Sequence, residues 1–128
     1  MTNFLWIALG GALGAMARYG LTEQVQKWLG PGFAWGTLSV NLLGCFLIGV
    51  AFHAISAVGP LPHEVRFLAV VGFLGAFTTF STFSLEIVNF LRDGQFTTAA
   101  GYVLLSNIVG VGLCFAGLQA GHKLFHHT

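Results

Sequence analysis

The sequence predicts an all-α membrane protein in which residues 1–128 form a single domain of four transmembrane helices. Two observations carry this prediction. First, 55% of the residues are hydrophobic and only 7% are charged, whereas about a quarter of the residues in soluble domains are charged, and a soluble chain this short could not bury so much apolar surface. Second, the charged residues separate four long uncharged runs, and a spanning helix needs about 20 apolar residues.

The four runs place the expected helices at 3–21, 35–55, 67–91 and 96–119. The connections between them carry turn-forming residues: "GPG" at 30–32, "VGPLP" at 58–62 and "RDG" at 92–94. We do not expect strands, because transmembrane strands alternate apolar and polar residues over about 10 positions. The "AMA" at 15–17 resembles a signal-peptide cleavage site, but no Lys or Arg precedes the apolar run, so we expect the first helix to be retained.

The orientation of these helices is open. Arg66 and Lys123 fall on one predicted side of the membrane, and Arg18, Lys27 and Arg92 fall on the other. Because Lys and Arg near span ends set orientation, two against three gives almost no bias. Either one strong positive charge decides, or the chain inserts both ways and pairs head-to-tail with itself, which would create the inverted symmetry common in membrane transport proteins.

Small residues recur at the spacing that lets helix backbones approach closely. The alternative is that glycine is simply frequent in membrane helices. The pairs are Gly10 and Gly14, Gly11 and Ala15, and Gly117 and Gly121. Cys45 and Cys114 lie within apolar runs, which favours small buried thiols over a disulfide or a metal site.

The segment "FTTFSTFS" at 77–84 places five hydroxyl residues within the third run. Buried polar groups are costly unless they are satisfied. Each hydroxyl could bond back to the carbonyl four residues earlier, but the second and fourth runs also hold Asn41, Tyr102, Ser106 and Asn107. Together these groups predict a polar pathway through the membrane.

Phe77, Phe80 and Phe83 recur every three residues, which predicts that they share one helical face. Such a stripe often serves packing alone. An aromatic ring, however, has a positive edge, and hydroxyls and amides supply hydrogen-bond donors. The combination suits a small hydrated anion, because conduction needs several weak sites rather than one tight one.

We expect no charged side chain in the middle of any run. A proton-driven exporter would need a carboxylate there, and the four acids are Glu23, Glu64, Glu86 and Asp93. Glu86 follows the hydroxyl segment and lies either at a pore mouth or at a helix end. Arg18, near the expected end of the first helix, forms either an electropositive vestibule or an interfacial anchor.

The stretch "GFLGAFTTFSTFS" at 72–84 predicts an interruption of the third helix, because two glycines and several hydroxyls compete with helical hydrogen bonding. An interruption would free backbone carbonyls. At membrane depth these need a partner from protein, water or a cation.

Three motifs resemble the Fluc/CrcB family of fluoride channels: "GGALGAMARY" at 10–19, "GTLSVNLLGCFLIG" at 36–49 and "GFLGAFTTFSTFSLE" at 72–86. The resemblance covers essentially the whole chain. It implies a dual-topology, antiparallel homodimer with two pores that passively exports fluoride across the bacterial inner membrane. The implied partners are the fluoride ion, a second copy of the chain and the lipid bilayer, without nucleic acid.

The resemblance also implies roles for individual residues. The fluoride pathway would be lined by Asn41, Phe80, Ser81, Thr82, Phe83, Tyr102 and Ser106. The backbone carbonyls of Gly75 and Thr78 would hold a structural sodium ion at the dimer interface, and Arg18 and Glu86 would belong to a vestibule. The C-terminal "GHKLFHHT" has no counterpart in the resemblance, and we expect its histidines, His122, His126 and His127, to form an interfacial tail rather than a metal site.

Two other functions remain open. A proton-coupled small multidrug exporter would also have four helices and dual topology, but the first run holds no carboxylate in its middle. A non-transporting membrane scaffold would use the hydroxyls only to join helices. An enzyme is not expected, because the sequence contains no recognisable nucleophile–base pair or metal-ligand cluster.

Overall fold

The computed structural model describes residues 2–57 and 62–125, and these contain four helical segments long and apolar enough to cross a membrane. The prediction of an all-helical chain with four such segments is confirmed. The elements are α1 (Thr2–Leu29), α2 (Trp35–Ala57), α3 (His63–Val65), η1 (Arg66–Leu74), α4 (Gly75–Phe77), α5 (Phe80–Arg92) and α6 (Phe96–Phe125).

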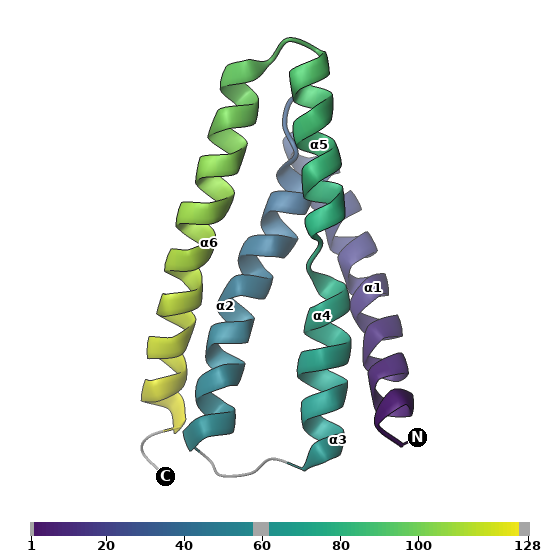
Figure 1. The fold of residues 1–128 in the computed structure, drawn as a ribbon, viewed down its shortest axis with the longest axis vertical. Helices are drawn as coiled ribbons and strands as arrows, with labels where there is room; N and C mark the ends of the chain where they lie inside the picture. Colours follow the sequence, from purple (N-terminus) through teal and green to yellow (C-terminus); the bar gives the residue numbers. More distant parts are fainter. Residues whose placement is uncertain (1, 58–61, 126–128) are drawn as a thin grey trace.

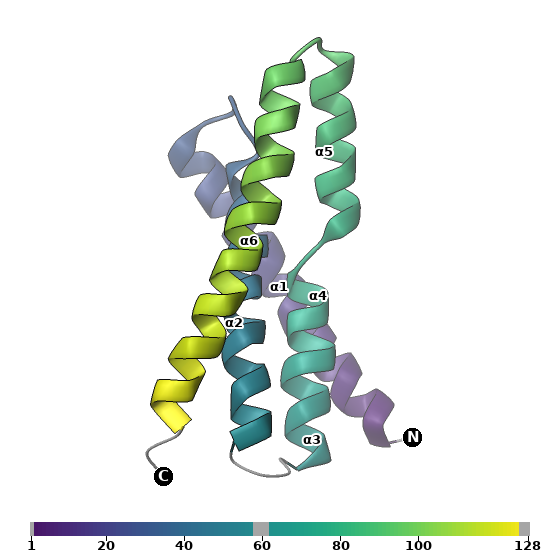
Figure 2. The same cartoon turned by 60° about the vertical axis from the view of Figure 1, so that its left-hand side comes forward.

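The four segments run up and down in one elongated bundle (Figures 1 and 2). The start of α1, the end of α2, the start of α3 and the end of α6 lie at one end. The connections from α1 to α2 and from α5 to α6 lie at the other. Of the predicted "VGPLP" connection at 58–62, residues 58–61 lie outside the described residues.

Helix α1 continues to Leu29, eight residues beyond the end at 21 that the apolar run predicted. The added residues form an ordinary polar helix, which ends at Gly30 with a φ of 88° and a bond of 2.9 Å from its N–H to the Gln26 carbonyl. Arg18 therefore lies eleven residues before the last residue of α1. The expectation that Arg18 lies near the end of the first helix is therefore wrong.

Glycines bring helix backbones into direct contact at several helix pairs, including α1 with η1 and α2 with α6. A Cβ added to Gly10 or Gly14 of α1 would collide with the backbone carbonyls of Leu68 or Phe73 in η1. A Cβ added to Gly117 of α6 would collide with the Phe46 carbonyl in α2. The small-residue spacing thus serves close packing within this chain, as expected for helices in lipid.

Segment η1 is π-helical over nine residues, a geometry that is rare beyond a single turn. Nothing in the sequence marks it, and we have no physical account of its length. η1 packs along α1, and α1 also contacts α4. α5, in contrast, contacts α6 and α2 but not α1.

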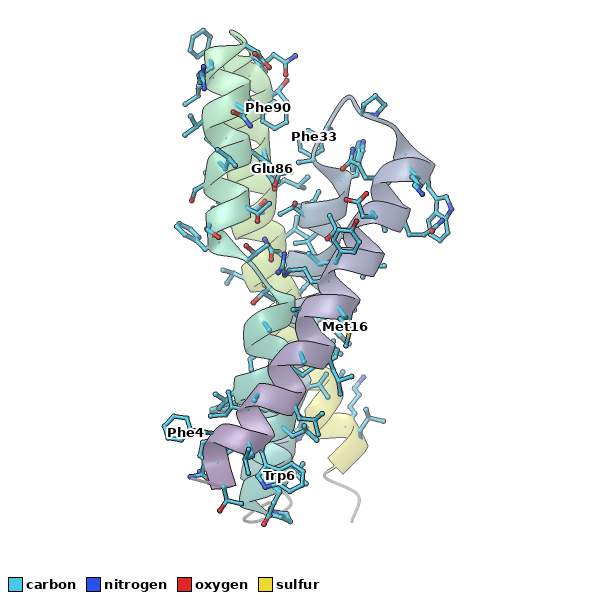
Figure 3. The ribbon with its side chains drawn as sticks, turned by 90° about the vertical axis from the view of Figure 1, so that its right-hand side faces the viewer. Phe4, Trp6, Met16, Phe33, Glu86 and Phe90 are labelled. Carbon is cyan, nitrogen blue, oxygen red and sulfur yellow. The ribbon has the colours of Figure 1, made fainter. Side chains whose placement is uncertain are left out.

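The outer surface of the bundle is apolar. Phe4 and Met16 of α1 point away from the other helices (Figure 3) and are 74% and 63% exposed. A lipid environment tolerates such side chains because there is no water for them to avoid. With the four long apolar helices, this surface fits a multi-pass membrane protein.

Candidate functional site

Two threonines separate α4 from α5. Thr78 has φ −91° and ψ 156°, and Thr79 has φ −147° and ψ 120°, so both are extended. The Thr79 hydroxyl accepts a 3.2 Å bond from the Thr82 N–H and so caps the start of α5. The Thr78 hydroxyl donates to the Leu74 carbonyl at 3.2 Å. Side-chain oxygens therefore take part in the hydrogen bonding on both sides of the two extended residues.

Asn41 of α2 pairs with the backbone of Thr79 through both ends of its amide. Its Nδ2 donates to the Thr79 carbonyl at 3.0 Å, and its Oδ1 accepts from the Thr79 N–H at 2.8 Å. Both backbone groups of one extended residue are thus satisfied by one side chain. An unpaired peptide group at membrane depth costs several kcal/mol. The pairing with Asn41 removes this penalty for the extended backbone of Thr79.

These bonds release two particular carbonyls from helical pairing. In a continuous helix the N–H of Thr79 would bond to the carbonyl of Gly75, and the N–H of Thr82 to that of Thr78. Here the Thr79 N–H goes to Asn41 and the Thr82 N–H goes to the Thr79 hydroxyl. The carbonyls of Gly75 and Thr78 therefore lack the donors that a continuous helix would give them.

Arg18 contacts the last turn of α4. Its Nε donates to the carbonyl of Ala76 at 3.0 Å, which places a cation at the C-terminal end of a helical segment, where the backbone dipole favours it. The side chain is part-buried. Arg18 of α1 and Asn41 of α2 thus bond to the same interruption from two different helices.

A cavity of about 440 Å³ lies beside the two extended residues. It brings together six of the residues to which the family resemblance assigned roles: Asn41, Gly75, Thr78, Phe80, Phe83 and Ser106. Its other lining residues are Gly44, Cys45, Ile48, Val70, Leu74, Thr79 and Asn107. The lining is apolar with a few hydroxyl and amide groups, and it contains no Asp, Glu, Lys or Arg.

The three phenylalanines do not share one face, so that prediction is wrong. Phe77 precedes the interruption, is buried and stacks on Phe73 with ring centroids 5.6 Å apart. Phe80 and Phe83 follow the interruption, and their centroids lie 5.8 Å apart. Phe80 is 79% exposed and Phe83 only 8%. The helical period fails because Thr78 and Thr79 are not helical.

Glu86 faces the interior of the bundle rather than solvent. The Tyr102 hydroxyl donates to its Oε1 at 3.1 Å. The Thr37 hydroxyl lies close to both groups, and Thr37 and Tyr102 are almost fully buried. The sequence pointed to Glu86 and Tyr102 but missed Thr37, whose only signal is a hydroxyl in the first turn of α2.

Ser81, Thr82 and Tyr102 do not line the cavity. Ser81 is exposed, and its hydroxyl lies 3.4 Å from that of Thr79. The Thr82 hydroxyl accepts from the Thr79 hydroxyl at 3.2 Å. Ser81 and Thr82 thus form a hydroxyl cluster around the start of α5, whereas Tyr102 lies farther along, against Phe83 and Glu86.

No group of three metal-ligating side chains occurs among residues 2–57 and 62–125. Cys45 and Cys114 are free thiols on α2 and α6. His122 lies in the last turn of α6, where its ring contacts that of His53 at 4.9 Å. His126 and His127, which the sequence placed in an interfacial tail, lie outside the described residues.

A family described as "CrcB-like protein, Camphor Resistance (CrcB)" matches residues 5–118. The chain is 48% identical to a protein of Magnetococcus marinus over 119 residues, covering 93% of this chain and 97% of that protein. It is 46% identical to a Thermus thermophilus protein over 124 residues, covering 97% and 98%, and 46% identical to a Geobacter sulfurreducens protein over 121 residues, covering 94% of each.

Each of these relatives is named "Fluoride-specific ion channel FluC", and an ion channel is not an enzyme. The resemblance inferred from the three sequence motifs is confirmed by the family match and by relatives similar over nearly their whole length. The chain belongs to the CrcB-like family.

Proposed function

We propose that this protein is a passive, fluoride-selective ion channel. The observation that carries the proposal is the cavity beside Thr78 and Thr79, whose lining offers an amide, hydroxyls and two phenylalanine rings but no ionised side chain. Ring edges and hydrogen-bond donors attract a small anion weakly enough to let it leave. The names of the relatives support fluoride as that anion.

A proton-coupled exporter is less well supported. It requires a carboxylate on the transport route that exchanges protons. Glu86 follows the cavity-lining residue Phe83 by three positions, but it does not line the cavity and accepts a hydrogen bond from Tyr102. A passive channel needs no such group, because the inside-negative membrane potential drives fluoride out of the cytoplasm once it has entered as neutral hydrofluoric acid.

A scaffold without transport would explain the hydroxyls of Thr78 and Thr82, which bond within the chain. It does not explain why Phe80 is 79% exposed beside an open cavity. A second copy of the chain would cover this face. We therefore propose an antiparallel homodimer in which the interrupted third helix of each copy faces the other, with two pores and dual topology in the bacterial inner membrane.

A structural sodium ion fits the same interface. The carbonyls of Gly75 and Thr78 are the two that lose helical donors to Asn41 and to the Thr79 hydroxyl. Gly75 is exposed in the single chain and lines the cavity, so this part of the backbone is open to a partner. Carbonyl oxygens from two copies would supply the hard oxygen ligands that such a cation prefers. Bound there, sodium would be coordinated by the carbonyl oxygens and hold the two copies together.

The function is tested by reconstituting the purified protein into liposomes loaded with potassium fluoride and recording efflux with a fluoride-selective electrode after addition of valinomycin. We expect rapid fluoride efflux, little chloride efflux from matched vesicles, and no change when a pH gradient is imposed or collapsed. Stoichiometric coupling of fluoride to protons would contradict the channel, and absence of fluoride efflux would contradict the function altogether.

The sodium site is tested by exhaustive replacement of sodium with N-methylglucamine during purification and assay. Because the cation would be structural, we expect fluoride efflux to fall and to return when millimolar sodium is restored, while labelled sodium does not cross the membrane. Full efflux after thorough sodium depletion would remove sodium from the proposal without affecting the channel function.

A further inference from the structure

Gln26, near the end of α1, makes three hydrogen bonds across the connection from α1 to α2. Its Nε2 donates to the carbonyls of Gly30 and Phe33, at 2.6 Å and 2.7 Å. Its Oε1 accepts from the N–H of Gly36 at 3.1 Å. One side chain thus joins the end of α1, the middle of the connection and the first turn of α2.

The Gly36 bond satisfies one of the backbone donors that every helix leaves unpaired in its first turn. Gly36 also packs directly against the backbone of α1. A Cβ at this position would collide with the Thr22 carbonyl. The start of α2 is therefore fixed against α1 both by contact and by hydrogen bonding. The next residue along α2 is Thr37.

The connection that Gln26 holds reaches directly to the polar group around Glu86. Phe33 packs its ring against those of Tyr102, at 5.2 Å, and Phe90, at 5.9 Å. The Thr37 hydroxyl lies close to Glu86 and Tyr102. Figure 3 shows Phe33, Glu86 and Phe90 gathered between the connection and α5. α5 does not contact α1 directly, so this connection is one route by which α1 can influence α5, beside the route through α4 and the interruption.

We propose that Gln26 is a positioning residue for the channel: it sets Phe33 against Tyr102 and Thr37 against Glu86, and so keeps the polar group beyond the Phe83 ring assembled. The inference rests on the proposed function, because its consequence is measured as fluoride flux. Gln26 itself does not line the cavity and touches no ion path. Its effect passes through the backbone of the 30–36 connection.

The test compares Gln26→Met, which removes all three bonds at similar side-chain volume, with Gln24→Met, the same change at an exposed position of the same helix. We expect Gln26→Met to lower fluoride flux about tenfold, the order expected for groups coupled in one hydrogen-bond network. Gln24→Met should match the parent. Size-exclusion chromatography and thermal unfolding are recorded for both.

A double-mutant cycle with Thr37→Val separates positioning from general destabilisation. If Gln26 acts by placing Thr37, its loss has little further effect once the Thr37 hydroxyl is gone, so the double variant should conduct about as well as Thr37→Val alone. If Gln26 only stabilises the fold, the two reductions multiply, and the inference is overturned. Equal flux in Gln26→Met and Gln24→Met would also overturn it.

Gln26→Glu serves if Gln26→Met does not assemble. It keeps the acceptor for the Gly36 N–H but places a carboxylate oxygen, which cannot donate, against the carbonyls of Gly30 and Phe33. It should therefore also lower fluoride flux and show the same non-additivity with Thr37→Val. Additive losses there would overturn the inference. A parent protein without fluoride efflux would instead contradict the proposed function, so the two failures are distinguishable.

Discussion

The segment before Thr78 and the segment after Thr79 are attached to the rest of the bundle in different ways. Before the interruption, η1 lies directly on the backbone of α1, with Gly10 and Gly14 at the contact. After it, α5 is held by side chains, with Phe83 and Glu86 both reaching Tyr102 of α6. The first attachment requires that Gly10 and Gly14 have no side chain. The second depends on the chemistry of particular side chains.

This difference explains where function can reside. Backbone contact through glycine is rigid and gives one arrangement, as close packing in lipid requires. The side-chain contacts of α5 leave polar atoms and ring edges at the cavity while still fixing the helix. Before the interruption, the third span gives the cavity only apolar side chains and the backbone of Gly75, whereas its rings and hydroxyls there come from Thr78 onward. Changes at the glycine contacts with α1 should therefore mainly affect stability, and changes after the interruption should mainly affect transport.

The largest effect is expected for Gly10→Ala. An added methyl would meet the Leu68 carbonyl of η1, and backbone atoms cannot yield as the end of a side chain can, so we expect a loss of about 3 kcal/mol in the free energy of unfolding. The control is Gly20→Ala in the same helix, where an added Cβ meets nothing within 4 Å. Thermal unfolding in detergent measures both. Equal stability of the two variants would refute the account of backbone contact.

A smaller loss of stability, with a complete loss of transport, is expected for Asn41→Leu. The change leaves the N–H and carbonyl of Thr79 without their partner, which should cost about 2 kcal/mol, and removes an amide from the cavity. Asn89→Leu, at an exposed position of α5, is the matched control. Normal fluoride flux in Asn41→Leu would show that neither the amide nor the geometry it fixes is needed.

A feature of the structure can be predicted from the sequence when residues close together in the chain determine it. Length and apolarity place four spans, because transfer into lipid is a property of each segment alone. Glycines and hydroxyls within 72–84 predict an interruption because they compete with helical hydrogen bonding, but they do not indicate that it falls at Thr78 and Thr79. The extension of α1 to Leu29 was missed because its last turns are polar, so an apolar run cannot reveal them.

Contacts between segments escaped the same reasoning. Thr37 belongs to the polar group only because the start of α2 meets α5, and no local pattern encodes that meeting. Phe77 was assigned to a face with Phe80 because a helical period assumes a continuous helix. The sequence singled out Asn41 but did not indicate that it pairs with Thr79.

The smallest effect is expected for Thr79→Val. The change removes the hydroxyl that caps α5 and accepts from the Thr82 N–H, which should cost about 1 kcal/mol, while Asn41 still pairs with the Thr79 backbone. Thr97→Val, at an exposed position in the first turn of α6, is the control. Thermal unfolding and fluoride flux should both show a modest decrease for Thr79→Val. A loss as large as that of Asn41→Leu would mean that the cap, rather than the amide, fixes the interruption.

The central claim is that fluoride is conducted by oriented dipoles and ring edges, without an ionised side chain in the cavity. Fluoride efflux from liposomes carrying Phe80→Ile or Phe83→Ile tests it most directly, because isoleucine keeps an apolar side chain but lacks the polarised ring edge. The account predicts that both variants remain assembled as dimers and lose most of their fluoride flux. Undiminished flux in both variants would contradict it.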